Sequence, residues 1–180
     1  LASEFWIPYT RSLAAERLII DMPDQTVFQI PEELLSQCFE QALADHPNET
    51  CGMLSGLKSE AEVVNACHPL TNALVELHEL DPERHPRSPR EGYLIDPREQ
   101  LRLDREFRKS GREMRIIYHS HPDAGAYFSE QDIADALWDG RPRYPGIQYL
   151  VVGVKQNEQN GAILAVFNEA SGGFDTHRIC

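Results

Sequence analysis

Apolar residues along this chain recur at helical spacing in some stretches and form short β-prone runs in others, a pattern typical of an α/β protein. A helix is predicted over residues 31–45, because Pro31 is favourable in a first helical turn and the apolar residues after it fall on one face. The same reasoning predicts a helix from Pro97 that ends at Gly111, and a third from 129 to about 138.

Short runs rich in β-branched and aromatic residues predict the strands of a sheet. Two of them are expected to form a hairpin around Gly56, and the last three are expected to close the sheet as antiparallel strands. The predicted strands are Val27–Ile30, Thr50–Ser55, Glu62–His68, Met114–Tyr118, Gln148–Val154, Gly161–Asn168 and Phe174–Ile179.

These elements predict a single domain over residues 26–180. Residues 1–25 have no clear period, and we expect an N-terminal extension, part of which derives from cloning. Residues 71–96 are expected to be an insertion into the domain. The centre of this insertion is rich in proline and charge, which predicts a mobile segment.

The chemistry of the chain is concentrated after the strand predicted at 114–118. His119 and His121 stand at its C-terminal end, and residues i and i+2 of a strand point to the same face, roughly 6–7 Å apart. Two imidazoles at this separation can converge on one metal ion. Asp132 is the natural third ligand, since catalytic zinc takes three protein ligands of nitrogen and oxygen type and leaves the fourth position to water.

The same residues also have an ordinary structural interpretation. Ser129 is a favourable N-cap, and Asp132 lies three residues later, as in a capping box. Taken singly, the serine and aspartate explain a helix start, and the histidines explain a polar surface. Taken together at this spacing, they favour a metal cleft between a strand end and a helix start.

Composition narrows the classes of partner. The formal net charge of −12 argues against nucleic acid, and no apolar run is long enough to span a bilayer. Ten of the seventeen basic residues lie within 84–115, which indicates either a solvated helix face or a docking face for an acidic protein. We expect no secretion signal, and four cysteines without a CxxC pair predict reduced thiols in a cytoplasmic protein.

The run His-Ser-His-Pro, with Ser129 and Asp132 at these distances, resembles the signature of the JAMM (MPN-plus) zinc isopeptidases, and the chain looks most like their prokaryotic branch. The block from Asn48 to Gly56 resembles the upstream block of that family, which places Glu49 where the family has its glutamate. The resemblance covers about residues 27–170. It implies a cytidine deaminase-like α+β fold, with a curved mixed β-sheet flanked by helices.

The resemblance also implies the site and its activity. One Zn²⁺ per chain would be held by His119, His121 and Asp132, with Glu49 as the general base and Ser129 as an oxyanion donor. The implied reaction is cleavage of the amide after the C-terminal glycine of a ubiquitin-like protein, whose extended tail is the substrate. E1- and E2-like partners and a homodimer are further expectations.

Two alternatives remain open. One is a sulfur-carrier peptidase that releases cysteine in biosynthesis, which would share every active-site position. The other belongs to a different class, a non-catalytic scaffold of the same fold that binds a partner protein.

Overall fold

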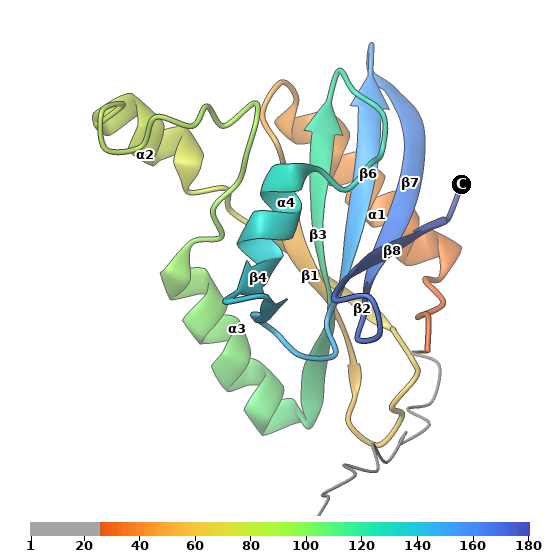
Figure 1. Cartoon of the computed structure of the whole chain (residues 1–180). Coiled ribbons are helices and arrows are strands. Elements are labelled where there is room, and N and C mark those ends of the chain that lie inside the picture. The colour runs from red at the N-terminus through yellow and green to blue at the C-terminus, as the bar shows by residue number, and fades with distance from the viewer. Residues whose placement is uncertain (1–25) are drawn as a thin grey trace, which may run out of the picture.

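The computed structural model describes residues 26–180, so the expected extension at 1–25 lies outside the described residues. Over the described part, helices and strands alternate along the chain (Figure 1). The helices are α1 (Glu32–Asp45), α2 (Leu74–Leu80), α3 (Pro97–Ser110) and α4 (Glu130–Ala136). The strands are β1 (Cys51–Leu57), β2 (Ala66–Leu70), β3 (Arg112–Pro122), β4 (Leu137–Trp138), β5 (Arg141–Pro142), β6 (Gln148–Lys155), β7 (Glu158–Asn168) and β8 (Gly173–Arg178).

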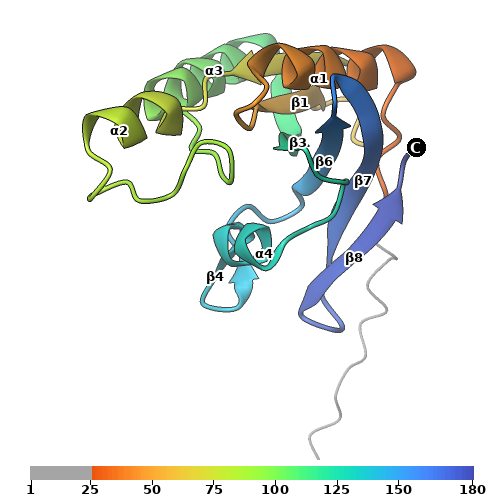
Figure 2. The ribbon, with the colours of Figure 1, turned by 90° about the horizontal axis from the view of Figure 1, so that it is seen from above.

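The main sheet has six strands in the order β2-β1-β3-β6-β7-β8. β3 and β6 are parallel, and every other neighbouring pair in this sheet is antiparallel. Seen from above, the sheet bends from β1 to β8, with α4 on its inner side and α1 on its outer side (Figure 2). The curved mixed sheet with flanking helices confirms the predicted fold class.

Side chains along β3 point alternately to the two faces of the sheet, so each residue packs against the helix on its own face. Ile116 and Tyr118 pack in one core cluster with Cys38 and Phe39 of α1. Ile117 points to the opposite face and packs in another cluster with Ala136 of α4. Because side chains alternate along a strand, His119 and His121 point to the same face as Ile117, toward α4.

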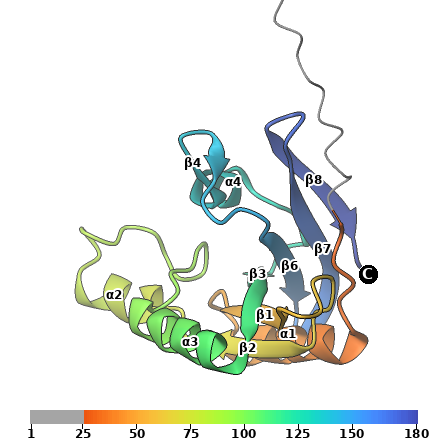
Figure 3. The ribbon, with the colours of Figure 1, turned by 90° about the horizontal axis from the view of Figure 1, so that it is seen from below.

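α3 covers the remaining part of this inner face. Its buried residues Leu103 and Phe107 pack against Cys51 and Met53 of β1. The view from below shows α3 beside β2 and β1 (Figure 3). In the same view α4 and β4 lie together, separate from α3. None of the helices in residues 26–180 has the length and apolar character needed to cross a bilayer.

Two strand predictions need correction. Instead of a strand at Val27–Ile30, the described chain has a single bridge between Gln29 and Val63. The strand expected at Glu62–His68 begins only at Ala66 and runs to Leu70. The hairpin partner was predicted correctly, but Gly56 lies inside β1, where a Cβ would overlap the carbonyl of Val63.

Two further predictions on either side of β5 were also inexact. α4 ends at Ala136, because the next two residues leave the helix and pair with β5. β6 is antiparallel only to β7, and its other neighbour is parallel. The segment through α4 and the β4–β5 hairpin is long enough to act as the crossover that a parallel pair requires.

The insertion at 71–96 contains the short helix α2, which its proline and charge content did not indicate. Its two ends pair with each other through a bridge between Asn72 and Ile95. The mobility of its centre remains a prediction.

Candidate metal centre

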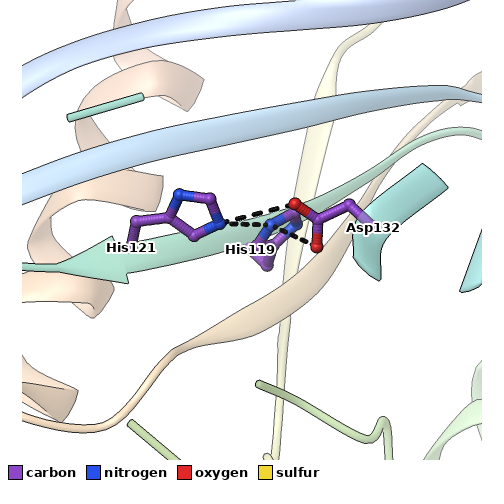
Figure 4. Close-up of side chains that lie close together, drawn as sticks. All are labelled: His119, His121 and Asp132. Atoms are coloured by element: carbon purple, nitrogen blue, oxygen red, sulfur yellow. Dashed lines mark hydrogen bonds and ion pairs between the residues drawn. The ribbon is translucent and has the colours of Figure 1, made fainter. Parts of the chain in front are cut away.

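The end of β3 and the start of α4 bring His119, His121 and Asp132 together (Figure 4). The Nε2 atoms of the two histidines are 3.2 Å apart. Asp132 Oδ1 lies 3.3 Å from His119 Nε2, and its Oδ2 lies 3.5 Å from His121 Nε2. All three residues are buried. The structure therefore joins the three residues that the sequence spacing had placed in one cleft.

The three donor groups match what zinc requires. With Zn–N and Zn–O distances of about 2.0–2.2 Å, a tetrahedral centre places neighbouring ligand atoms about 3.3–3.5 Å apart. The 3.2 Å between the two Nε2 atoms and the 3.3 Å from Asp132 Oδ1 to His119 Nε2 are close to this edge length, and the 3.5 Å to His121 Nε2 is measured from the other carboxylate oxygen, Oδ2. Two imidazole nitrogens and a carboxylate oxygen are also the donor set of zinc sites that keep an open position. The geometry fits one divalent ion.

Electrostatics keeps His119 and Asp132 in the protonation states that bind a metal. Complete burial lowers the pKa of His119, although the neighbouring Asp132 opposes the shift, so the imidazole stays neutral at pH 7. Burial would raise the pKa of Asp132, but hydrogen bonds with His119, His121 and Ser129 hold it well below its ordinary value. Neutral imidazoles and an ionised carboxylate are the forms that coordinate metal ions.

Ser129 fixes the carboxylate of Asp132 through the predicted capping box, which the structure confirms. Asp132 Oδ2 accepts hydrogen bonds from the backbone N–H of Ser129 at 2.8 Å and from its hydroxyl at 2.6 Å. The hydroxyl oxygen in turn accepts from the backbone N–H of Asp132 at 3.1 Å. The local sequence that starts α4 thus also orients the third donor group.

Glu49 lies between α1 and β1, and only 5% of its surface is exposed. Burial, and next the charge of Asp132, raise the pKa of its carboxyl to about 8, while Arg87 acts in the opposite direction. Its buried Oε2 has no hydrogen-bond partner among residues 26–180. A buried carboxylate without a protein partner is expensive, which makes it a candidate for a functional group.

Ser120 connects the segment of Glu49 to the histidine strand. Its hydroxyl accepts the backbone N–H of Thr50 at 2.8 Å, and its own N–H donates to the Thr50 carbonyl at 3.1 Å. The side chain points away from the histidines, as strand alternation predicts. Its contacts therefore give it a structural role, joining the start of β1 to β3.

Two tyrosines contact the histidines, and no pattern in the sequence predicted either contact. The ring of Tyr93, from the end of the insertion, stacks on His119 with centroids 4.8 Å apart and planes 23° apart. Tyr127 contacts His121, with centroids 4.6 Å apart. The buried Nδ1 atoms of both histidines have no hydrogen-bond partner in the described chain. Ring packing therefore orients imidazoles that in many metal sites are oriented by hydrogen bonds.

A pocket of about 320 Å³ opens beside Asp132. One wall comes from the insertion, including Arg87 and Tyr93, and another from the segment after β5, including Tyr144. The lining is mostly aromatic and aliphatic, with a few charged groups, as is common for ligand-binding clefts.

The curved mixed sheet and the buried His-His-Asp cluster define a protein of the JAB/MPN class. The chain belongs to the Prok-JAB family, the prokaryotic homologs of the JAB domain, whose profile matches residues 31–165. This confirms the family resemblance of the sequence motifs.

Curated relatives carry peptidase names. The chain is 32% identical over 120 residues to desampylase of Haloferax volcanii, which covers 67% of this chain and 73% of that protein. It is 31% identical over 112 residues to a probable TtuB-protein conjugate cleaving protease of Thermus thermophilus, and the match covers 62% of this chain and 65% of that protein. It is 32% identical over 107 residues to CysO-cysteine peptidase of Mycobacterium tuberculosis, and the match covers 59% of this chain and 64% of that protein. The chain thus spans somewhat less than two thirds of the second and third proteins.

Solved structures share the fold. A solution structure of a protein from Desulfitobacterium hafniense matches with a TM-score of 0.62 and 26% identity, covering 84% of this chain and 90% of that one. A solution structure from Salinibacter ruber matches with a TM-score of 0.54 at 24% identity, covering 86% and 89%.

Proposed function

We propose that this chain is a zinc-dependent isopeptidase that cleaves the amide after the C-terminal residue of a small ubiquitin-like protein. The observation that carries the proposal is the buried cluster of His119, His121 and Asp132, whose separations fit a tetrahedral zinc site. Membership of the Prok-JAB family and the peptidase names of the relatives support it.

In this proposal the three clustered residues hold one Zn²⁺ per chain. When bound, zinc would lower the pKa of a water molecule toward neutrality and polarise the scissile carbonyl. Asp132 contributes its oxygen in an orientation set by Ser129. Tyr93 and Tyr127 pack against the two imidazole rings and help to hold their orientation.

Glu49 serves as the general base. Its free Oε2 would accept a proton from the attacking water and pass it to the departing amine. Burial, and then the negative charge of Asp132, raise the pKa of the Glu49 carboxyl to about 8. Opposite charge nearby lowers the pKa of a carboxyl, so a cation in the cluster would bring Glu49 back toward its ionised, basic form.

Ser129 is proposed to stabilise the oxyanion by donating its hydroxyl proton. In the structure that proton is given to Asp132 Oδ2, so the donation would require the hydroxyl to rotate between two acceptors. The hydroxyl oxygen keeps its bond from the Asp132 N–H in either orientation, since that bond uses a lone pair and not the proton.

The substrate class follows from the relatives and the pocket beside Asp132. A desampylase and a TtuB-protein conjugate cleaving protease are named for protein conjugates. The cleft of about 320 Å³, with its aromatic lining, supports an extended peptide tail as occupant. A sulfur-carrier peptidase is the second candidate, favoured by the similarity to CysO-cysteine peptidase. Both candidates share the site and differ in the leaving group.

The experiment is cleavage of ubiquitin-like proteins joined through their C-terminal glycine to a lysine side chain or to cysteine. Zinc content is measured on the same sample, and each reaction is repeated with a chelator and after zinc is restored. Chelator-sensitive cleavage of the lysine isopeptide supports the isopeptidase, and cleavage of the cysteine adduct alone supports the sulfur-carrier peptidase. A protein that binds no zinc and cleaves neither would be the scaffold alternative.

A further inference from the structure

The two ends of the insertion meet at Asn72, which is 7% exposed. The N–H of Ala73 donates to the Leu94 carbonyl at 2.8 Å, and Asn72 and Ile95 form an antiparallel bridge. The segment between residues 73 and 94 is therefore a loop closed at Asn72, and it carries α2 (Figure 1).

The side-chain amide of Asn72 makes four hydrogen bonds to backbone groups. Its Nδ2 donates to the carbonyls of Glu49 at 2.9 Å and Gly92 at 3.1 Å. Its Oδ1 accepts the N–H groups of Leu74 at 3.0 Å and Leu94 at 3.1 Å. These bonds use both donors and both acceptor sites of the amide. Two carbonyls on one side and two N–H groups on the other allow only one orientation of the side chain.

These four hydrogen bonds hold the backbone of Glu49 and the backbone next to Tyr93. Gly92 and Leu94 flank Tyr93, whose ring stacks on His119. The backbone of Glu49 is held by the insertion at both of its polar groups, because its N–H donates to the Pro89 carbonyl at 2.7 Å and its carbonyl accepts from Asn72. One buried amide thus contacts the backbone of the proposed base and both neighbours of the ring that packs on a proposed metal ligand.

We propose that Asn72 is the positioning residue of this site, holding Glu49 and Tyr93 in a fixed relation through the insertion. The catalytic part of this proposal rests on the proposed function, while the structural part does not. An apolar replacement leaves two buried carbonyls and two buried N–H groups without their partner, and these groups cannot all recover hydrogen bonds inside the protein. The segment around Tyr93 and the Glu49 backbone would then loosen together.

The structural part is tested by residue-resolved amide hydrogen exchange in zinc-loaded protein. In Asn72→Ala the amides of Leu74, Leu94 and Glu49 should exchange about tenfold faster or more, relative to amides of β6 that report global opening. Asn157→Asp, at an exposed turn between β6 and β7, is the control and should leave all three unchanged. Unchanged exchange at the three amides of Asn72→Ala overturns the proposal.

Asn72→Asp separates the two halves of the amide. Its carboxylate still accepts from Leu74 and Leu94, but an oxygen then faces the Glu49 carbonyl, where a donor is needed. We expect Leu74 and Leu94 to stay protected. The Glu49 N–H, which donates to the Pro89 carbonyl, should lose protection because the insertion is no longer held at the carbonyls of Gly92 and Glu49. Should this variant fail to fold, Asn72→Ala and Asn72→Ser carry the same exchange test without a buried charge.

The catalytic part is tested with the lysine isopeptide substrate of the preceding section. Asn72→Ala should lower kcat about tenfold or more, with a smaller change in KM and one zinc per chain retained. A kcat that is unchanged, or that falls only in proportion to zinc content or folded fraction, overturns the positioning role. If the wild-type protein cleaves nothing, the proposed function fails, and the exchange data still decide the role of Asn72 in holding Glu49.

Discussion

The carboxylate of Asp132 is shared between a helix cap and the candidate metal cluster. One oxygen accepts two hydrogen bonds from Ser129, and the other lies 3.3 Å from the Nε2 of His119. The residue pair that starts α4 therefore also sets the position of the Asp132 carboxylate beside the histidines of β3. Stability of the helix and affinity for the metal are expected to depend on the same bonds.

Ser129→Ala is expected to lower the free energy of unfolding by about 0.5–2 kcal/mol, the usual effect of removing a helix N-cap. Zinc affinity should fall as well, because Asp132 loses the hydroxyl that donates to its Oδ2 and keeps only the bond from the backbone N–H of residue 129. Urea unfolding and a competitive zinc indicator would measure the two effects. Ser129→Thr keeps a hydroxyl cap and should recover most of both, and an unchanged zinc affinity in the alanine variant would contradict the shared role.

Glu49→Gln is expected to keep the fold and one zinc per chain while losing turnover. The change removes the proposed base but no metal donor, and general base catalysis contributes on the order of 10²–10⁴-fold. Zinc content and kcat should be measured on one preparation. Glu158→Gln, an exposed glutamate at the start of β7, is the matched control and should be fully active. Near wild-type cleavage by Glu49→Gln would show that another group is the base.

His119→Ala is expected to lose zinc, because the cluster is left with two of its three donors. Metal analysis after dialysis against a weak chelator gives the stoichiometry. His68→Ala is the comparison, since His68 bonds to the Ser55 hydroxyl at 2.8 Å and lies outside the cluster. Stoichiometric zinc in His119→Ala would refute the donor assignment.

Tyr93 should affect zinc through the orientation of the His119 ring. Tyr93→Phe keeps the stacked ring and is expected to bind zinc with near wild-type affinity. Tyr93→Ala removes the ring and should weaken zinc binding by about 10–100-fold, the range seen when groups that orient metal ligands are lost. Equal zinc affinities of the phenylalanine and alanine variants would exclude this role for the ring.

Stability of the metal-free protein should depend on pH through Glu49. Burial, and then the charge of Asp132, raise its pKa from an ordinary value near 4.5 to about 8. A carboxyl with a raised pKa in the folded state contributes stability that is fully present below its ordinary pKa and is lost as pH rises through the folded value. Chelator-treated wild-type protein should therefore lose stability relative to Glu49→Gln between about pH 5 and about pH 8.5. Parallel pH dependence of the two proteins would contradict the shift.

The metal cluster was accessible from the sequence because its geometry is local. Strand alternation places His119 and His121 on one face, and the capping preference of Ser129 sets the start of the helix that carries Asp132. Fourteen consecutive residues, from His119 to Asp132, therefore contain all three donor groups. Glu49 was found only through resemblance to a family, since nothing in its local sequence distinguishes it from an exposed glutamate.

The structure of the insertion at 71–96 could not be predicted from the sequence. Its proline and charge content gave no indication of a helix or of a contact with the histidines, yet the structure places α2 in it and Tyr93 against His119. The four bonds of Asn72 join segments that are distant along the chain, and an asparagine before a helix is equally consistent with a simple turn. Hydrogen bonds of this kind leave no period in the sequence.

The parallel pairing of β3 with β6 also depended on the tertiary structure. The apolar run of residues 148–154 indicates a buried strand but says nothing about the direction of its neighbour. Local patterns in the sequence were enough to predict the order of most elements, the face of β3 that carries the histidines and the family. Tertiary structure decided the neighbours of each strand, the closure of the insertion and the contacts around Glu49, because these depend on packing between segments that only the folded chain brings together.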